Sequence, residues 1–295
     1  MTALPLWPAL QPEPGKLAEP LPDALPIRRG IWGKVPGEAS DYRWISRSAN
    51  FADGCPDLAG ALRIGAEDTP VTAPLWRRLP DRLCAVAVYP SRAIDSAGRL
   101  TVIEKQVCEW LISPDIPAAL AALTLLPAIA RRGDQDWWSQ RDQGHWHRGD
   151  YALPIDPADC APIPVDAATL PERIDNAITD LLQATTTEQL QSFYATLLSG
   201  QFPAALPTPA PLPPEALAAL LLPLPRTWAD RLSIAGGLAD RRPSRYDLIR
   251  NWDVAVTSSA LRDSPPFSAP DASDMAKTLV ETLRELAEPD PVRES

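Results

Sequence analysis

The segment from Ile116 to Arg132, IPAALAALTLLPAIARR, decides how the rest of the chain must be arranged. Alanine and leucine dominate it, and no charged residue appears before Arg131. A helix that is apolar on nearly every side is stable only when most of its surface is buried. We therefore expect a central core helix here, bent or broken near Pro127, because proline lacks the N–H of the helical hydrogen bond.

The sequence before this helix favours strands. Two runs, LCAVAVYPSR from Leu83 and LTVIEKQVCEWLI from Leu100, flank AIDSAG, whose residues are typical of a turn, and together they predict a β-hairpin. Further upstream, IWGKV from Ile31 and DYRWISRS from Asp41 predict two short strands joined by a turn at PGEAS.

The sequence after the core helix favours helices. Apolar residues recur at helical spacing in PERIDNAITDLLQ, from Pro171. Thr185 and Glu188 have the spacing of a capping box, which would begin a second helix that ends at Gly200. The residues of this helix that are expected to face inward are Leu190, Phe193, Tyr194, Leu197 and Leu198. The short connection predicts that the two helices form an antiparallel pair. The proline-rich FPAALPTPAPLPP, from Phe202, is interpreted as a linker, followed by a short buried helix in PEALAALLLPL.

The end of the chain completes the expected fold. DVAVTSS predicts a strand that returns to the sheet of the first half, and a final helix is expected at 272–287. The predicted class is α+β, with a mainly β N-terminal half packed on the core helix and a mainly helical C-terminal half. The expected parts are a proline-rich arm at 1–27, a β-rich half with the core helix at 28–165, and a helical half returning one strand to the sheet at 166–295.

Composition excludes several classes of protein. The chain has 295 residues, 45% of them hydrophobic, which is enough for a substantial core, and its 35 prolines predict a loop-rich fold. A formal charge of −10 disfavours a nucleic-acid or anionic-membrane partner, because binding to either relies on a positive field. The arm at 1–27 is expected to wrap the domain, with a docking tail as the alternative.

The expected compartment is the cytoplasm. The four cysteines, which are distant from one another in sequence, fit reduced thiols better than a disulfide framework or a zinc knuckle. The N-terminus has too much proline for a signal peptide. The sequence also lacks a run of about 18 apolar residues, the length that would predict a membrane helix.

One stretch could support metal chemistry. The chain contains two histidines, His145 and His147, and with the nearby Asp150 they form a possible ligand set for a metal-dependent hydrolase or nuclease. A structural role for a His-Trp-His tract is the favoured interpretation. No nucleophile elbow and no phosphate-binding glycine loop is found, so we expect no cofactor and consider an enzyme the less favoured class.

Aromatic residues and arginines point instead to binding. Of the 10 tryptophans, Trp7, Trp137, Trp138 and Trp146 lie in polar or proline-rich surroundings, where an exposed indole is a good interface anchor. In the strand from Asp41, alternation would place Trp44 on one face and Arg43 and Arg47 on the other. Trp32 is expected to supply further apolar surface for packing. The region is therefore interpreted as a rigid β-platform that presents arginines to a carboxylate-rich or phosphate-bearing partner.

Two stretches carry a resemblance to a known family: IWGKVPGEASDYRWISRSANF from Ile31 and LPRTWADRLSIAGGLADRRPSRYDLIRNWDVAV from Leu224. They resemble the N-terminal region of the GTPase-associated proteins of bacterial NTPase-dependent conflict systems, over about Gly30 to Val256. The resemblance implies a cytoplasmic adaptor that couples a small GTPase or other NTPase to an effector in defence against phage. It supplies no catalytic residues.

The preferred function is therefore a non-enzymatic interaction module of a multi-protein bacterial system. The candidate binding residues are Trp32, Arg43, Trp44, Arg47, Trp137, Trp138 and Trp146. The first alternative is a metal-dependent hydrolase or nuclease that uses His145, His147 and Asp150. A third interpretation is a structural subunit whose proline-rich arm wraps a neighbour.

Overall fold

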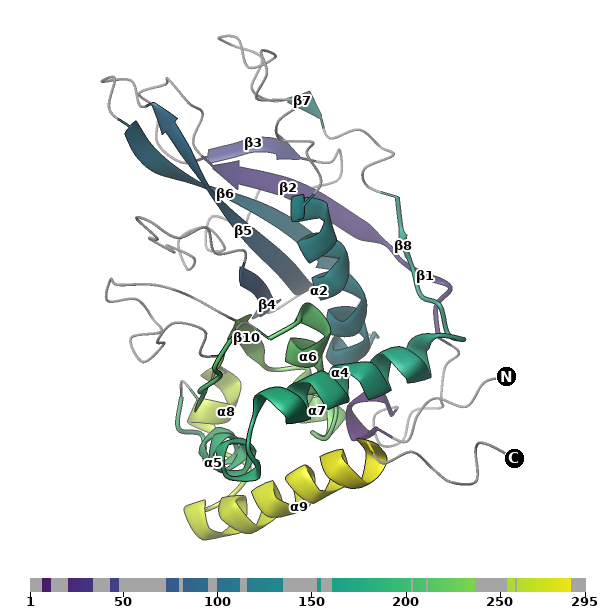
Figure 1. The fold of residues 1–295 in the computed structure, drawn as a ribbon, viewed down its shortest axis with the longest axis vertical. Helices are drawn as coiled ribbons and strands as arrows, with labels where there is room; N and C mark the ends of the chain where they lie inside the picture. Colours follow the sequence, from purple (N-terminus) through teal and green to yellow (C-terminus); the bar gives the residue numbers. More distant parts are fainter. Residues whose placement is uncertain are drawn as a thin grey trace.

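The structure, a computed structural model, combines α-helices with a large β-sheet, which confirms a mixed α and β fold (Figure 1). It describes residues 7–11, 21–33, 43–47, 73–79, 82–94, 100–111, 116–134, 153–154, 161–202, 204–210, 212–236, 254–257 and 259–287.

Within the described residues, the main sheet has nine strands in the order β7-β3-β2-β6-β5-β4-β10-β11-β9. Neighbouring strands are antiparallel except for β3 and β7, which are parallel. In chain order the strands are β2 (Ile27–Gly33), β3 (Arg43–Arg47), β4 (Ala73–Leu79), β5 (Arg82–Ile94), β6 (Leu100–Leu111), β7 (Leu153–Pro154), β9 (Ala204–Leu206), β10 (Ser233–Gly236) and β11 (Val254–Thr257). A separate antiparallel pair joins β1 (Ala24–Leu25) to β8 (Ile163–Pro164).

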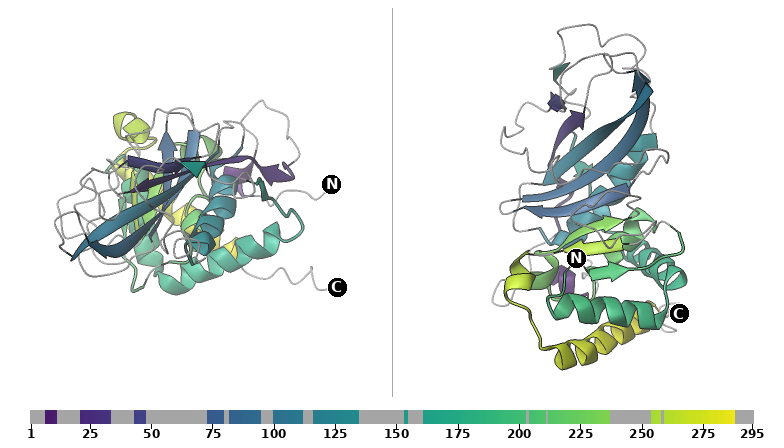
Figure 2. Two further views of the ribbon diagram at one scale, coloured as in Figure 1. Left: turned by 90° about the horizontal axis from the view of Figure 1, so that it is seen from above. Right: turned by 90° about the vertical axis from the view of Figure 1, so that its left-hand side faces the viewer.

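Two predicted features of the sheet are present. The hairpin forms as β5 and β6, which pair from Leu83 opposite Leu111 to Ile94 opposite Leu100. The predicted returning strand forms as β11, which reaches the sheet through β10, the neighbour of β4. Three strands of the second half, β9, β10 and β11, thus extend the sheet, and Figure 2 shows them between the blue strands and the lower helices.

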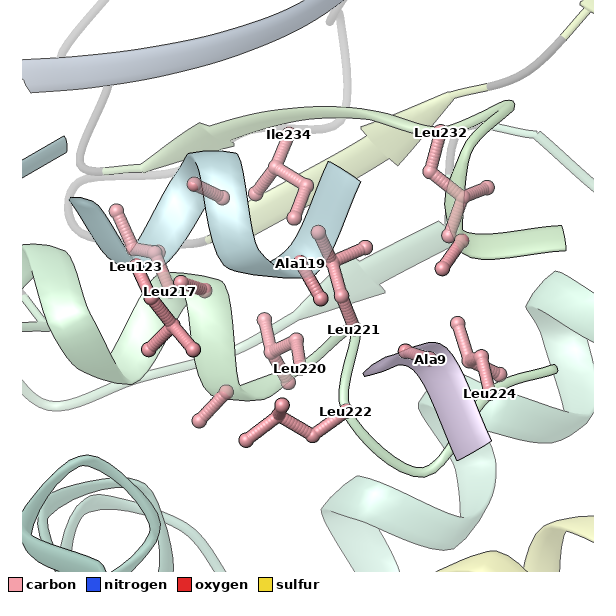
Figure 3. Packing of buried hydrophobic residues seen from close by; sticks show 14 of the residues in the cluster. Ala9, Ala119, Leu123, Leu217, Leu220, Leu221, Leu222, Leu224, Leu232 and Ile234 are labelled. Carbon is pink, nitrogen blue, oxygen red and sulfur yellow. The ribbon is translucent and has the colours of Figure 1, made fainter. Parts of the chain in front are cut away.

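The predicted core helix is confirmed as α2 (Ala118–Asp134). Every residue from Ala118 to Leu126 is buried, and none exposes more than 2% of its surface. The helix contacts β4, β5 and β6 on one side and α6 (Pro214–Ala219) on the other (Figure 1). Figure 3 shows Leu123 beside Leu217, with Ile234 of β10 on the opposite side of the helix. The apolar helix is therefore enclosed between the sheet and α6.

Pro127 does not break α2, because the helix continues to Asp134. Proline cannot donate to the carbonyl four residues earlier, which belongs to Leu123. A guanidinium nitrogen of Arg173, in α4 (Leu170–Ala184), donates a hydrogen bond to that carbonyl. The buried oxygen that proline leaves without its helical donor is thus satisfied from another helix.

The N-terminus of α2 also takes its polar partner from the second half of the chain. The backbone N–H of Ala118 donates to Oδ1 of Asp230, 2.8 Å away. Oδ2 of the same carboxylate pairs with Nε of Arg226 at 3.4 Å, across one turn of α7 (Arg226–Ala229). A carboxylate is favourable here because it accepts an otherwise unbonded N–H at the positive end of the helix dipole.

The remaining helices form the lower layer of the molecule (Figure 1). They are α4, α5 (Thr187–Leu198), α8 (Ser259–Asp263) and α9 (Ala269–Ala287). The predicted inward residues of α5 are all buried: Leu190, Phe193, Tyr194, Leu197 and Leu198. The expected antiparallel pairing of α4 with α5 is wrong: α5 packs on α9, and α4 packs on α6 and α9, with α4 and α5 crossing steeply (Figure 1).

The capping box of α5 lies one residue later than predicted. Thr186, not Thr185, is the N-cap: its hydroxyl accepts from the N–H of Gln189 at 3.2 Å, and Oε1 of Gln189 accepts from the N–H of Thr186 at 2.7 Å. The hydroxyl of Thr185 instead donates to the Leu181 carbonyl at the end of α4, at 2.6 Å. Thr185 belongs to the end of the preceding helix and is not available to begin the next one.

The proline-rich segment from Phe202 is not the predicted linker. Ala204 and Leu206 are buried in β9, which pairs with β11, and Thr208 and Leu212 are buried beyond it. Prolines flank the strand, where a missing backbone N–H does not interrupt the ladder. The segment therefore contributes a strand and four buried residues to the domain.

We expect Arg173→Ala to lower the free energy of unfolding by about 1–3 kcal/mol, because it leaves the buried Leu123 carbonyl without its donor. The decisive measurement is a double-mutant cycle with Pro127→Ala, which restores a backbone N–H to α2, followed by urea denaturation. In the Pro127→Ala background, Arg173→Ala should lower the free energy of unfolding by a clearly smaller amount. The exposed Asn176→Ala on the same helix is the control and should change stability by less than about 0.5 kcal/mol. An equal cost of Arg173→Ala in both backgrounds would disprove the link.

Gly200 ends α5, as predicted, and cannot be replaced without strain. Its φ is +71°, its N–H donates to Leu197, and the N–H of Gln201 donates to Thr196, which together form a Schellman motif. A Cβ at this position would lie 2.9 Å from the Leu261 carbonyl oxygen and 2.9 Å from Cβ of Pro265.

Gly200→Ala should therefore destabilise the protein by about 2 kcal/mol or more, by combining left-handed backbone strain with two close contacts. Thermal unfolding measures the effect, with the exposed Gln201→Ala as the matched control. A melting temperature of Gly200→Ala equal to that of the control would contradict the proposed strain.

Candidate interaction surface

The predicted β-platform corresponds to β2 and β3. These strands pair antiparallel, with Trp32 opposite Trp44, Gly33 opposite Arg43 and Gly30 opposite Arg47. On its other side β2 pairs with β6 from Ile27 to Gly33. Four of the seven predicted binding residues therefore lie on two adjacent strands that are continuous with the central sheet.

The register shifts between Ile31 and Trp32, where Ile31 lies opposite Ser46 and Trp32 opposite Trp44. This irregularity leaves Ile45 as an extra residue on β3. Such a bulge interrupts the strict alternation of faces. The expected assignment of Arg43 and Arg47 to one common face rested on that alternation, so the bulge removes its basis.

The outer side of β3 is paired over a short length. Within the described residues, its outer partner is β7, which meets it at Ser46 and Arg47. β3 and β7 lie at the end of the sheet opposite to β9, away from the helices α5 and α9 (Figure 1). The strand that carries both candidate arginines is thus peripheral in the described sheet.

The remaining predicted site residues lie outside the described residues. They are Trp137, Trp138 and Trp146, together with the alternative metal ligands His145, His147 and Asp150. Within the part of the chain that the structure describes, no group of three or more His, Cys, Asp and Glu side chains could hold a metal ion. The metal-site hypothesis therefore stays a prediction.

Trp7, which was expected to be an exposed anchor, is buried. It exposes 3% of its surface and belongs to the same core cluster as α2. Its polar and proline-rich neighbours in sequence suggested exposure, but the short 3-10 helix η1 (Pro8–Leu10) carries this segment against α2 and α7. For the described residues 7–11, the expectation that the arm packs on its own domain is confirmed.

Buried polar groups in the helical half have structural roles, and sequence patterns did not reveal their hydrogen-bond partners. Tyr194 is fully buried, and its hydroxyl donates to the Leu220 carbonyl at 3.0 Å. Burial raises the pKa of this phenol well above its usual value, so the group stays neutral and acts as a hydrogen-bond donor. Arg173 and Asp230 have similar fixed roles at α2. Sequence spacing could not identify them because their partners are distant in the chain.

The described helices include none that is both long enough and apolar enough to cross a lipid bilayer. Comparison with protein-family models and with curated proteins yields no match. Among solved structures, the chain is similar to PA0076 from Pseudomonas aeruginosa PAO1, with 16% sequence identity over 85% of this chain and 94% of that one, and a TM-score of 0.26. A likeness this distant carries no functional argument.

Metal analysis tests the alternative set of His145, His147 and Asp150. If these residues form a metal site, the purified protein should contain stoichiometric zinc or manganese by mass spectrometry, and a His145→Ala/His147→Ala variant should lose it. We expect no bound metal in either protein. Stoichiometric metal that disappears in the double variant would establish the site and favour the hydrolase or nuclease interpretation.

Proposed function

We propose that this protein is a non-enzymatic adaptor of a multi-protein bacterial system and binds a protein partner through β2 and β3. The observation that supports it best is the pairing of Trp32 with Trp44 on two strands that also carry Arg43 and Arg47. Tryptophan and arginine are enriched among the residues that dominate interface energetics. A paired sheet also holds such residues at fixed positions before the partner arrives, which reduces the entropy cost of binding.

The proposed partner is rich in carboxylates or carries phosphate. Arginine forms two parallel hydrogen bonds with either group, so a pair of arginines on one strand suits such a ligand. The chain as a whole has a formal charge of −10, so a general positive field does not account for this attraction. Recognition would depend on the local arginines of β3.

The resemblance to GTPase-associated proteins gives this proposal a setting. In that setting, the partners are a small GTPase or another NTPase and an effector, and the complex acts in the cytoplasm against phage. The finer organisation is part of the proposal: a proline-rich arm at 1–27, a β-rich half with the core helix at 28–165 and a mainly helical half at 166–295. Trp137, Trp138 and Trp146 would supply further anchors for the partner.

Under this proposal, an Arg43→Ala/Arg47→Ala variant should bind the NTPase partner at least about 10-fold more weakly, because the variant lacks the charge-assisted hydrogen bonds that the two arginines make. Isothermal titration calorimetry with both purified proteins measures the change. The matched control is Arg231→Ala/Arg262→Ala, which removes the same charge from exposed positions in the helical half. Unchanged affinity of the β3 variant, or an equal loss in the control, would count against the proposed surface.

A further inference from the structure

The strongest unassigned feature is the N-terminal turn, residues Trp7–Gln11, which fills an apolar site formed by other parts of the chain. Trp7, Ala9 and Leu10 expose 3%, 0% and 2% of their surfaces. The turn contacts α2 and α7, and Figure 3 shows Ala9 next to Leu222 and Leu224. Three of its five residues are therefore as buried as the core of the domain.

The turn has the properties of a bound peptide. Its internal hydrogen bonds, from Leu10 N–H to the Trp7 carbonyl at 2.9 Å and from Gln11 N–H to the Pro8 carbonyl at 3.3 Å, close it on itself. It is not a strand of either described sheet. The N–H of Ala9 donates to the Leu222 carbonyl at 3.3 Å, which fixes the turn at its centre. Side-chain burial and this bond are the interactions a short ligand would use.

The sequence of the turn matches this geometry. Trp7 has extended backbone, with φ −66° and ψ 124°, which is the conformation that the following proline favours. Pro8 begins the 3-10 helix, where its missing N–H needs no partner. Ala9 has no exposed surface, so its position accepts only a small side chain. The site thus selects a Trp-Pro-small-Leu order.

We propose that the apolar surface of α2, α7 and Leu222 is a peptide-binding site, occupied in cis by the N-terminal turn. Its ligand class is a short peptide of the form Trp-Pro-Ala-Leu in a 3-10 conformation. Covalent linkage through residues 12–20 keeps the ligand at an effective concentration of about a millimolar, so modest intrinsic affinity is sufficient to hold it. This inference is independent of the surface on β2 and β3.

The test uses the full-length chain, with residues 13–18 replaced by a site-specific protease sequence and cut after folding. Circular dichroism before and after the cut confirms that the body is intact. Native mass spectrometry should show the N-terminal fragment retained without a covalent link. A labelled synthetic peptide of residues 3–12, added in excess, should then displace the fragment, and fluorescence anisotropy measures its binding.

Variant peptides test the recognition. Trp7→Ala should weaken binding by about 30-fold, because a buried tryptophan is a typical hot spot, and Ala9→Lys should abolish it because the site has no room for a long charged chain. Pro8→Ala, at a half-buried position, keeps the three buried side chains and loses only the conformational restriction of proline, so it should weaken binding less than Trp7→Ala.

Three outcomes would overturn the proposal. Loss of the fragment after cutting, with no peptide binding at about 1 mM, would mean that the surface is no binding site. Equal binding of a scrambled peptide would mean nonspecific apolar adhesion. Retention of the fragment against a large excess of peptide for days would mean that the turn is a permanent part of the core.

Discussion

A buried helix that contains proline must find a donor for the carbonyl that the proline leaves unbonded, and α2 finds it in Arg173. The donor lies 50 residues from Leu123 in sequence, on α4. At its N-terminus the same helix relies on Asp230, 112 residues from Ala118. Because unsatisfied buried backbone groups cost free energy comparable to a lost hydrogen bond, the central helix is stable only when the second half is folded around it.

Because α2 depends on residues of the second half, the two halves of the chain share one core. α2 contacts β4, β5 and β6 on one side and α6 on the other, and β10 and β11 extend the same sheet from the second half (Figures 1 and 2). The candidate surface on β2 and β3 lies toward the opposite end of the sheet from β9. A partner bound there would meet strands that are remote from the helices α5 and α9. Binding at that edge would leave the shared core untouched.

The candidate binding residues were only partly predictable. The sequence indicated two strands at this place, and β2 and β3 form there. The pairing of Trp32 with Trp44 and the bulge at Ile45 depend on register, which alternation in a single strand does not contain. Trp7 illustrates the same limit, since its proline-rich neighbours suggested exposure whereas α2 and α7 bury it.

By itself the sequence determined features that are local. Unbroken apolar composition identified the core helix, helical spacing identified the buried residues of α5, and Gly200 marked its end. Tertiary structure decided features that need a distant partner. Thr185 and Thr186 are each followed three residues later by a Glu or Gln, so both have the spacing of a capping box. Because the Thr185 hydroxyl bonds to the end of α4, Thr186 is the N-cap of α5. The prolines from Phe202 suggested a linker until β11 supplied a neighbour for β9. Local propensities are weak in comparison with the burial and backbone pairing that a distant segment provides, so the distant segment prevails.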